Sequence, residues 1–318
     1  MNDNYFTDNF IKKDENSRTT SLVKRMVEIY NHNSLIQKRF VDSRRHISEF
    51  DRAYNYSEDF VAEKICLEKF KMELLKSVNN ELPIDDRWVI FQLHGGGYVN
   101  AFKNRYRMIA KIYSKISGNM DVLSVDYRVA PKDTYPAALE DAVSAYEWLV
   151  NKGYKEEHII AAGDSAGGGL AIAMCLWLRD NNKKLPAAVI GMSPWTDVSA
   201  SGASYKEKFD VDLIFGNTDN SIIFNSPYPG KHDPTEPYIS PIFSDMTGLP
   251  PMLIQVGTEE MLYDDSRVFT DRAREKGVNI RFTEYENMFH VFQLGGTRMP
   301  EAKLAWKEVQ RFIKKIKG

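Results

Sequence analysis

One serine in this chain stands between two glycines, in the pentapeptide Gly-Asp-Ser-Ala-Gly at 163–167. A short apolar run at 158–162 precedes the pentapeptide, and a helix-like run at 166–179 follows it. This order predicts a strand, a tight turn and a helix, with Ser165 at the apex. The glycines suit a turn in which a Cβ would clash, and the strained turn raises the hydroxyl clear of the sheet. We interpret Ser165 as a nucleophile, with an ordinary turn as the alternative.

A serine hydroxyl attacks a carbonyl only with the help of a base, and an acid must orient that base. In parallel sheets with such a turn, the groups follow strand ends in the order nucleophile, acid, base. His290 follows the last predicted strand, 280–285, and we predict that it is the base; packing within its loop is the alternative. Of the other histidines, His32 and His46 lie in the N-terminal segment, and His94 precedes a glycine run. His158 lies at the far end of the serine's strand, and His232 lies in a polar insertion.

The acid should follow the predicted strand at 252–256, where four carboxylates compete. Asp264 and Asp265 fit the N-terminal cap and first turn of the next helix, where negative charge suits the helix dipole. Glu259 and Glu260 come directly after the strand. We predict Glu260 as the acid, with Glu259 as the alternative, because a glutamate can hold the imidazole tautomer and balance its charge.

A glycine run, His94-Gly95-Gly96-Gly97, follows the predicted strand at 88–93. Glycines let main-chain N–H groups approach a developing oxyanion without obstruction from side chains. We predict that Gly95, Gly96 and Ala166 supply the oxyanion hole, and that His94 holds the loop. The alternatives are a simple turn and a phosphate cradle, but no Walker lysine follows the run and no GxGxxG pattern is present.

Strands and helices alternate along most of the chain, which predicts a mostly parallel sheet with helices on both faces. The segments 65–67 and 70–74 form the exception, because they are typical of a hairpin. The remaining predicted strands are 122–125, 187–192 and the ones named above, and the predicted helices are 108–116, 136–150, 265–276 and 301–317.

Two segments break this alternation. Residues 1–20 are polar, and we expect them to be loosely packed. From 21 to 60 the apolar positions recur at helical spacing, which predicts two or three amphipathic helices. The stretch at 199–238 is polar and aromatic and interrupts the strand–helix rhythm. We predict that 1–60 is a helical cap segment, that 61–318 is the catalytic domain, and that 199–238 is an insertion completing the cap.

Composition excludes several classes of protein. The 318 residues are 43% hydrophobic and 27% charged, with a net charge of -2, which indicates a soluble globular chain and argues against nucleic-acid binding. No apolar run is long enough for a membrane span, and the start resembles no signal peptide, so we expect a cytoplasmic location. We expect Cys66 and Cys175 to be buried free thiols, and no Cys/His spacing resembles a metal site.

Taken together, these motifs resemble the hormone-sensitive-lipase-like branch of the α/β-hydrolases, the bacterial family IV esterases. The resemblance covers roughly residues 63–318. It is carried by the sequences His-Gly-Gly-Gly at 94–97, Asp-Tyr-Arg-Val-Ala-Pro at 126–131, Tyr-Pro-Ala-Ala-Leu-Glu-Asp at 135–141, Gly-Asp-Ser-Ala-Gly-Gly at 163–168, Ser-Pro-Trp-Thr-Asp at 193–197, Ser-Pro at 240–241 and Leu-Pro-Pro at 249–251.

The resemblance implies an α/β-hydrolase fold and a serine carboxylesterase that takes a small ester and needs no metal or cofactor. The acid motif of the family is Asp-Pro-Leu-x-Asp, and the matching residues here begin with Glu260 in place of the aspartate. Lys132 is a second departure, because the family usually has glutamate after Ala-Pro. Four further charged residues are expected to form a structural network behind the oxyanion loop: Asp126, Arg128, Glu140 and Asp141.

The same triad could serve a lactonase, a deacetylase or an amidase, and the sequence does not separate these activities. A ligand-binding homologue on the same scaffold is disfavoured because Ser165 and His290 are both present. The charged cap segment favours short acyl chains over an interfacial lipase. Dimerisation through an edge strand or the last helix is left open.

Overall fold

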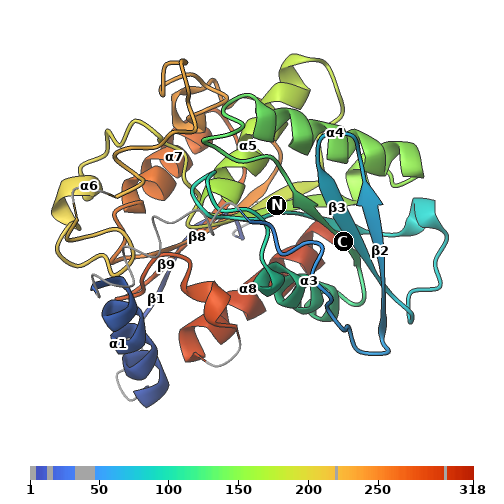
Figure 1. Ribbon diagram of the computed structural model, residues 1–318, viewed down its shortest axis with the longest axis horizontal. Coiled ribbons are helices and arrows are strands. Elements are labelled where there is room, and N and C mark those ends of the chain that lie inside the picture. The colour runs from blue at the N-terminus through green and yellow to red at the C-terminus, as the bar shows by residue number, and fades with distance from the viewer. Residues whose placement is uncertain (1–4, 13–16, 33–46, 219–220, 297–298) are drawn as a thin grey trace.

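The computed structural model describes the chain except for residues 1–4, 13–16, 33–46, 219–220 and 297–298. The described residues form one nine-stranded sheet in the order β1-β9-β8-β7-β6-β4-β5-β3-β2 (Figure 1). The pairs β2–β3 and β3–β5 are antiparallel, and every other neighbouring pair is parallel. The predicted α/β-hydrolase architecture, with a mostly parallel sheet, is therefore confirmed.

The strands are β1 Asp8–Ile11, β2 Phe60–Cys66, β3 Lys71–Ser77, β4 Val89–Leu93, β5 Asp121–Asp126, β6 Ile159–Asp164, β7 Ala188–Met192, β8 Met252–Gly257 and β9 Ile280–Tyr285. The α-helices are α1 Arg18–His32, α3 Asn104–Ile116, α4 Ala137–Lys152, α5 Ala166–Asp180, α6 Ser204–Glu207, α7 Tyr263–Glu275 and α8 Pro300–Lys317.

Helices cover both faces of the sheet. Side chains of α4, α5 and α7 pack in one core cluster, and those of α3 and α8 pack in a second cluster on the opposite face (Figure 1). Strand β4 shows how one strand serves both clusters, since Val89 and Phe91 belong to the first cluster and Ile90 to the second. Strands that are buried on both faces are mostly apolar, and the exceptions in the central strands, such as Gln92 and Gln255, bond to carbonyl groups within the core.

The N-terminal segment differs from its prediction. Residues 8–11 form β1, which extends the sheet by pairing in parallel with β9, so the expected loose packing of this stretch is wrong. A four-residue strand is too short to show a period in sequence, and it is stabilised here by the free edge of β9. Helix α1 follows, while the part of the predicted helical region at 33–46 lies outside the described residues. Residues 47–59 contain no helix.

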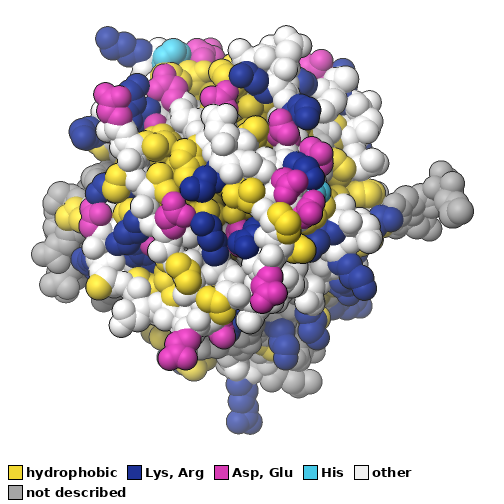
Figure 2. Space-filling model, turned by 90° about the vertical axis from the view of Figure 1, so that its right-hand side faces the viewer, with side chains coloured by type: hydrophobic (Ala, Val, Ile, Leu, Met, Phe, Trp, Pro, Cys, Tyr) yellow, Lys and Arg dark blue, Asp and Glu magenta, His cyan; other side chains and the backbone are white. Residues whose placement is uncertain are grey.

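The hairpin is confirmed, because β2 and β3 pair antiparallel with Ile65 opposite Met72. Strand β2 is an edge strand with one face in solvent, so Cys66 is exposed. The prediction of a buried thiol is therefore wrong for Cys66, whereas Cys175, in α5, is buried. The molecular face beside this hairpin carries Lys and Arg side chains mixed with Asp and Glu (Figure 2). Within the described ranges, no helix is long and apolar enough to cross a membrane.

Candidate active site

Three predicted side chains meet at the carboxyl edge of the sheet. Ser165 follows β6, Glu260 follows β8, and His290 follows β9. The Nε2 atom of His290 lies 2.9 Å from the Ser165 hydroxyl oxygen, and its Nδ1 atom lies 2.8 Å from Oε2 of Glu260. All three side chains are buried, and Ser165 is 5% exposed. A carboxylate beside Nδ1 favours the tautomer that carries the proton there, which leaves Nε2 free to accept the serine proton.

The turn around Ser165 is strained as its sequence predicts. Ser165 has φ 52° and ψ −124°, a backbone conformation that residues other than glycine rarely adopt. A Cβ on Gly163 would strike the main chain of Gly167, and a Cβ on Gly167 would strike the carbonyl oxygen of Leu93. Glycine at both positions therefore lets α5 begin directly against the sheet, and the hydroxyl is presented at the start of that helix.

The carboxylate of Glu260 is fully buried and accepts hydrogen bonds at both oxygens. Its Oε1 accepts from the Ser193 hydroxyl at 2.7 Å and from the Gly257 N–H at 2.6 Å, while Oε2 faces His290. Both oxygens of this buried carboxylate therefore have hydrogen-bond partners. They also fix the plane of the carboxylate, so Oε2 stays directed at the imidazole.

The competing carboxylates have other partners. Glu259 leaves the site and pairs with Lys24 of α1 at 2.5 Å, with its side chain 25% exposed. Asp264 and Asp265 lie in the first turn of α7, as predicted, but the N-cap residue is Leu262, so the capping role is wrong. Asp265 instead accepts the N–H groups of residues 196 and 197 at 2.8 Å, and Asp264 accepts the N–H of residue 204 at 2.9 Å.

The glycine run lies next to the serine, but one of its predicted donors is occupied. The N–H of Gly95 donates to Oδ1 of Asp164 at 3.1 Å, so it already has a partner here, and its role at the oxyanion stays a prediction. Gly96 and Gly97 have φ of 124° and 65°, and their N–H groups donate to no described residue. Ala166 opens α5, so its N–H has no partner within the helix. Gly96, Gly97 and Ala166 are therefore the available donors.

His94 holds the glycine loop, as predicted. Its Nδ1 donates to the Gly95 carbonyl at 2.9 Å, and its ring stacks on Tyr127 with centroids 4.1 Å apart. The Tyr127 hydroxyl donates to the His94 carbonyl oxygen at 2.5 Å. Burial lowers the pKa of His94 to about 3, which keeps the ring neutral. A neutral, stacked ring fixes the loop and adds no charge beside the nucleophile.

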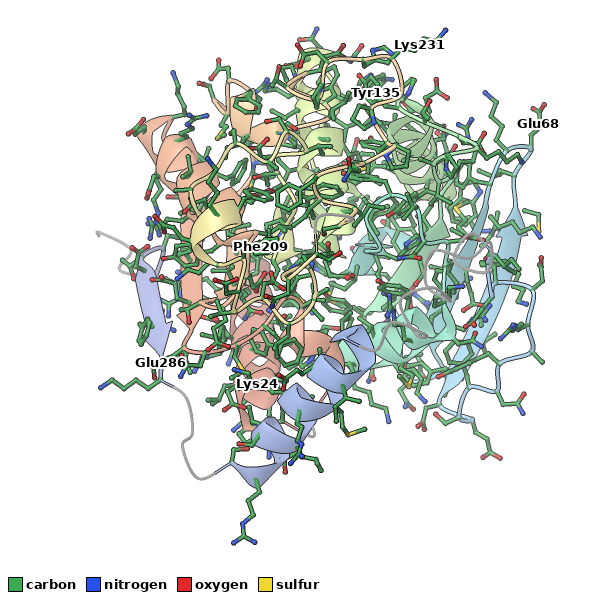
Figure 3. The ribbon with its side chains drawn as sticks, turned by 60° about the vertical axis from the view of Figure 1, so that its left-hand side comes forward. Lys24, Glu68, Tyr135, Phe209, Lys231 and Glu286 are labelled. Atoms are coloured by element: carbon green, nitrogen blue, oxygen red, sulfur yellow. The ribbon has the colours of Figure 1, made fainter. Side chains whose placement is uncertain are left out.

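The insertion at 199–238 packs over the site. The ring of Phe215 lies 4.9 Å from the ring of His290, and Ile222 lies against Gly97. Asp212 fastens the insertion to the acid turn, because its carboxylate accepts the N–H of Met261 at 2.7 Å and the N–H of Phe215 at 2.9 Å. Burial raises the pKa of this carboxyl group. Figure 3 labels Phe209 of the insertion and Lys24 of α1 on the same side of the molecule.

Two residues of the site were missed from the sequence. Ser193 stands in the Ser-Pro-Trp motif and bonds to Glu260, and that motif was the one available signal. Asp212 has no sequence signal, because its ligands are backbone groups brought to it by folding. The predicted charge network is confirmed for Arg128, which pairs with Glu140 and Asp141.

Asp126 does not join that network. Its carboxylate accepts instead from the Ser48 hydroxyl at 2.5 Å and from the Phe102 N–H at 3.2 Å. A hollow of about 490 Å³ lies beside it, between the β2–β3 hairpin and residues 126–133, and no triad residue lines this hollow. In the described part of the chain, no cluster of His, Cys, Asp or Glu could hold a metal ion.

Known proteins resemble this chain in sequence and in fold. Over residues 90–294 the chain matches the sequence profile of a family described as alpha/beta hydrolase fold. An acetyl-hydrolase from Streptomyces hygroscopicus is 37% identical over 234 residues, which cover 74% of this chain and 77% of that relative. An esterase from Acinetobacter venetianus is 34% identical over 233 residues, covering 70% of this chain and 74% of that relative.

Solved structures agree with the sequence relatives. An esterase from the bacterial hormone-sensitive lipase family superposes with a TM-score of 0.82 at 32% identity, over 95% of this chain and 99% of that one. The crystal structure of EstE5 soaked with p-nitrophenyl butyrate gives a TM-score of 0.81 at 30% identity, over 94% of this chain and 99% of that one.

Fold, motifs and relatives define the class: this is an α/β-hydrolase, of a family of carboxylic ester hydrolases. Within that class, the chain belongs to the bacterial hormone-sensitive-lipase branch, as its motifs had indicated.

Proposed function

We propose that this protein hydrolyses short-chain carboxylic esters through Ser165, His290 and Glu260, by way of an acyl-enzyme. The observation that carries the proposal is the unbroken chain of hydrogen bonds from the Ser165 hydroxyl through His290 to Glu260. Such a chain lets the serine lose its proton as it attacks, and lets the carboxylate stabilise the imidazolium that forms.

The reaction proceeds in two halves. In the first, Ser165 attacks the ester carbonyl carbon, His290 takes the hydroxyl proton, and the N–H groups of Gly96, Gly97 and Ala166 bind the oxyanion. The C–O bond to the alcohol then breaks, and the alcohol leaves with the proton from His290. In the second half, His290 deprotonates water, which attacks the acyl-enzyme, and the acid is released as Ser165 regains its proton.

A short acyl chain is supported by what packs around the triad. Phe215 lies on the His290 ring and Ile222 against Gly97, so apolar side chains of the insertion border the space next to the reacting atoms. The Streptomyces relative is named for acetyl groups, which are short acyl groups. Removal of acetyl groups is therefore the second candidate, and it needs the same triad.

We also infer that residues 1–60 and 199–238 together form a cap over the catalytic domain. The support is that Val23 and Val27 of α1 share an apolar cluster with Leu213 and Ile214 of the insertion. Strand β1 is the exception within this segment, since it belongs to the sheet. Dimerisation through an edge strand or α8, and a cytoplasmic location, stay predictions.

The test is turnover of p-nitrophenyl esters from acetate to decanoate, beside p-nitroacetanilide and a γ-lactone. We expect the highest kcat/KM at acetate to butyrate, and a loss of at least about a thousandfold in Ser165→Ala. A fluorophosphonate probe should label the wild type and not this variant. Turnover retained by Ser165→Ala would reject the mechanism, and faster cleavage of the anilide or lactone would change the substrate class.

A further inference from the structure

Ser193, which follows β7, has a backbone conformation that is unusual for its residue type. Its φ is 48°, and the side chain is fully buried at the carboxyl edge of the sheet. Few residues other than glycine adopt positive φ, and glycine does so without steric cost. Val291, next to His290, has φ 50°, which is a stronger outlier because its side chain is β-branched. Two such residues therefore lie beside the acid and the base.

The Ser193 hydroxyl joins these two places. It donates to Oε1 of Glu260 at 2.7 Å and accepts the N–H of Val291 at 3.3 Å. A hydroxyl has one proton to donate, and here that proton goes to the carboxylate. The Ser193 hydroxyl therefore donates its proton to the acid, and its oxygen accepts a hydrogen bond from the loop of the base. Its own N–H donates to the Gln255 carbonyl at 2.7 Å, which fixes Ser193 to β8.

We propose that Ser193 is a positioning residue of the triad, which holds the Glu260 carboxylate and the His290 loop in register with one another. The inference rests on the proposed function. The Gly257 N–H also bonds to Oε1, so it keeps Glu260 in place, but it does not contact the base's loop. Other bonds join the two loops, such as Glu259 N–H to the Met288 carbonyl at 3.1 Å, but they do not involve the Glu260 carboxylate. Ser193 joins that carboxylate to the loop of the base.

The retention of serine at this φ supports a role for the hydroxyl. A glycine here would remove the backbone strain, and strain of this kind is commonly found where function requires it. A Ser193→Gly variant therefore separates the two contributions, because it relieves the strain while it removes the hydroxyl. Ser193→Ala removes the hydroxyl and keeps the strain. Ala200→Gly is the matched control, since residue 200 has φ 54° and its N–H bonds to the Asp197 carbonyl oxygen rather than to a triad residue.

We expect both Ser193 variants to lose about ten- to thirtyfold in kcat for p-nitrophenyl butyrate, with KM nearly unchanged, because a hydrogen bond to a charged group is lost. The acid limb of the kcat/KM profile should move about half a pH unit upward, since a carboxylate with one donor fewer binds the imidazole proton more tightly. Asp212 and Asp164, whose charges also act on His290, are unchanged in these variants. Ala200→Gly should keep the wild-type kcat and profile.

The rates are measured well below the lower melting temperature and are divided by the active-site concentration from fluorophosphonate labelling. A loss that remains after this correction, together with the moved acid limb, supports the proposal. Wild-type kcat in Ser193→Gly, or a loss that follows only the folded fraction with an unmoved profile, overturns it. Failure of the proposed function would look different, because the wild type itself would then show no ester turnover and no labelling.

Discussion

The carboxyl edge of the sheet and the N-terminal segment are held in place by different kinds of bonds. At the edge, Glu260 and His290 are buried, and their polar atoms bond to one another or to groups at strand ends. The N-terminal segment adds partly exposed ion pairs, such as Lys24 to Glu259 and Asp8 to Arg274, to its strand pairing and to the buried bond from Thr20 to Glu301. Buried bonds are shielded from ions, whereas partly exposed pairs are screened by them.

The two regions also differ in apolar exposure. Helix α1 turns Val23 and Val27 inward to the cluster around the insertion, but Leu22 and Met26 are 59% and 61% exposed. The central strands show no such exposed apolar residues, because helices cover both faces. The difference shows that Glu260 and His290 are fixed by buried bonds, whereas Lys24 of the N-terminal segment contacts the acid and base loops from a partly exposed position.

Changing each of the two neighbouring glutamates in turn tests the difference between the two regions most directly. Glu260→Gln should lower kcat for p-nitrophenyl butyrate by about a thousandfold or more, because the amide no longer balances the imidazolium charge and favours the wrong tautomer. Glu259→Gln should change kcat no more than a few-fold, because its partner Lys24 is on the surface side. Glutamine is nearly isosteric with glutamate, so neither variant changes the size of its side chain. A larger loss in Glu259→Gln would move the acid by one residue.

A second prediction uses pH, to which buried groups of the edge respond. Burial lowers the pKa of His94 from 6.5 to about 3, so the unfolded chain binds a proton that the folded chain excludes. The contribution of His94 to the free energy of unfolding is therefore fully present above pH 6.5 and is lost as the pH falls toward 3. Between pH 7 and pH 5 the loss is about 2 kcal/mol in the free energy of unfolding.

His94→Gln isolates that contribution. Urea unfolding of the wild type and the variant at both pH values gives four free energies of unfolding. The wild type should lose about 2 kcal/mol more than the variant on going to pH 5. Buried carboxyl groups such as Asp164 titrate in both proteins and cancel. Equal losses in the two proteins would show that His94 is not buried as a neutral ring.

The smallest expected effect concerns the N-terminal segment. Lys24→Met removes the ion pair with Glu259 and the bond to the Asn287 carbonyl, and should lower Tm by about 1–2 °C and kcat/KM no more than a few-fold. Arg25→Met, on an exposed neighbour of the same helix, is the control. Salt at 1 M should reproduce part of the effect in the wild type and none in Lys24→Met. A thousandfold loss would make α1 part of the catalytic geometry.

Much of the site could be predicted from sequence because its signals are local. A serine between glycines, after an apolar run and before a helix, predicts a strained turn by itself. His290 and Glu260 each follow a predicted strand, and parallel strands bring their carboxyl ends to one edge. The sheet and its helices were predicted from the same alternation, with boundaries wrong by a few residues, as at α3, which begins at Asn104.

What sequence left undecided involves partners that are distant along the chain. The N–H of Gly95 was expected at the oxyanion, but Asp164, 69 residues away, accepts it, and no local pattern reports that pairing. Asp212 and Ser193 acquire their roles from groups on other loops, and Cys66 is exposed because β2 has no outer neighbour.

The sequence by itself determined which residues could react and the order in which strand ends would present them, since both follow from local propensity and from the period of apolar residues. The tertiary structure alone decided which donors remain free and which carboxylate meets the imidazole. Hydrogen bonds are directional and short, so a difference of one residue between Glu259 and Glu260 separates a surface ion pair from a buried partner of His290.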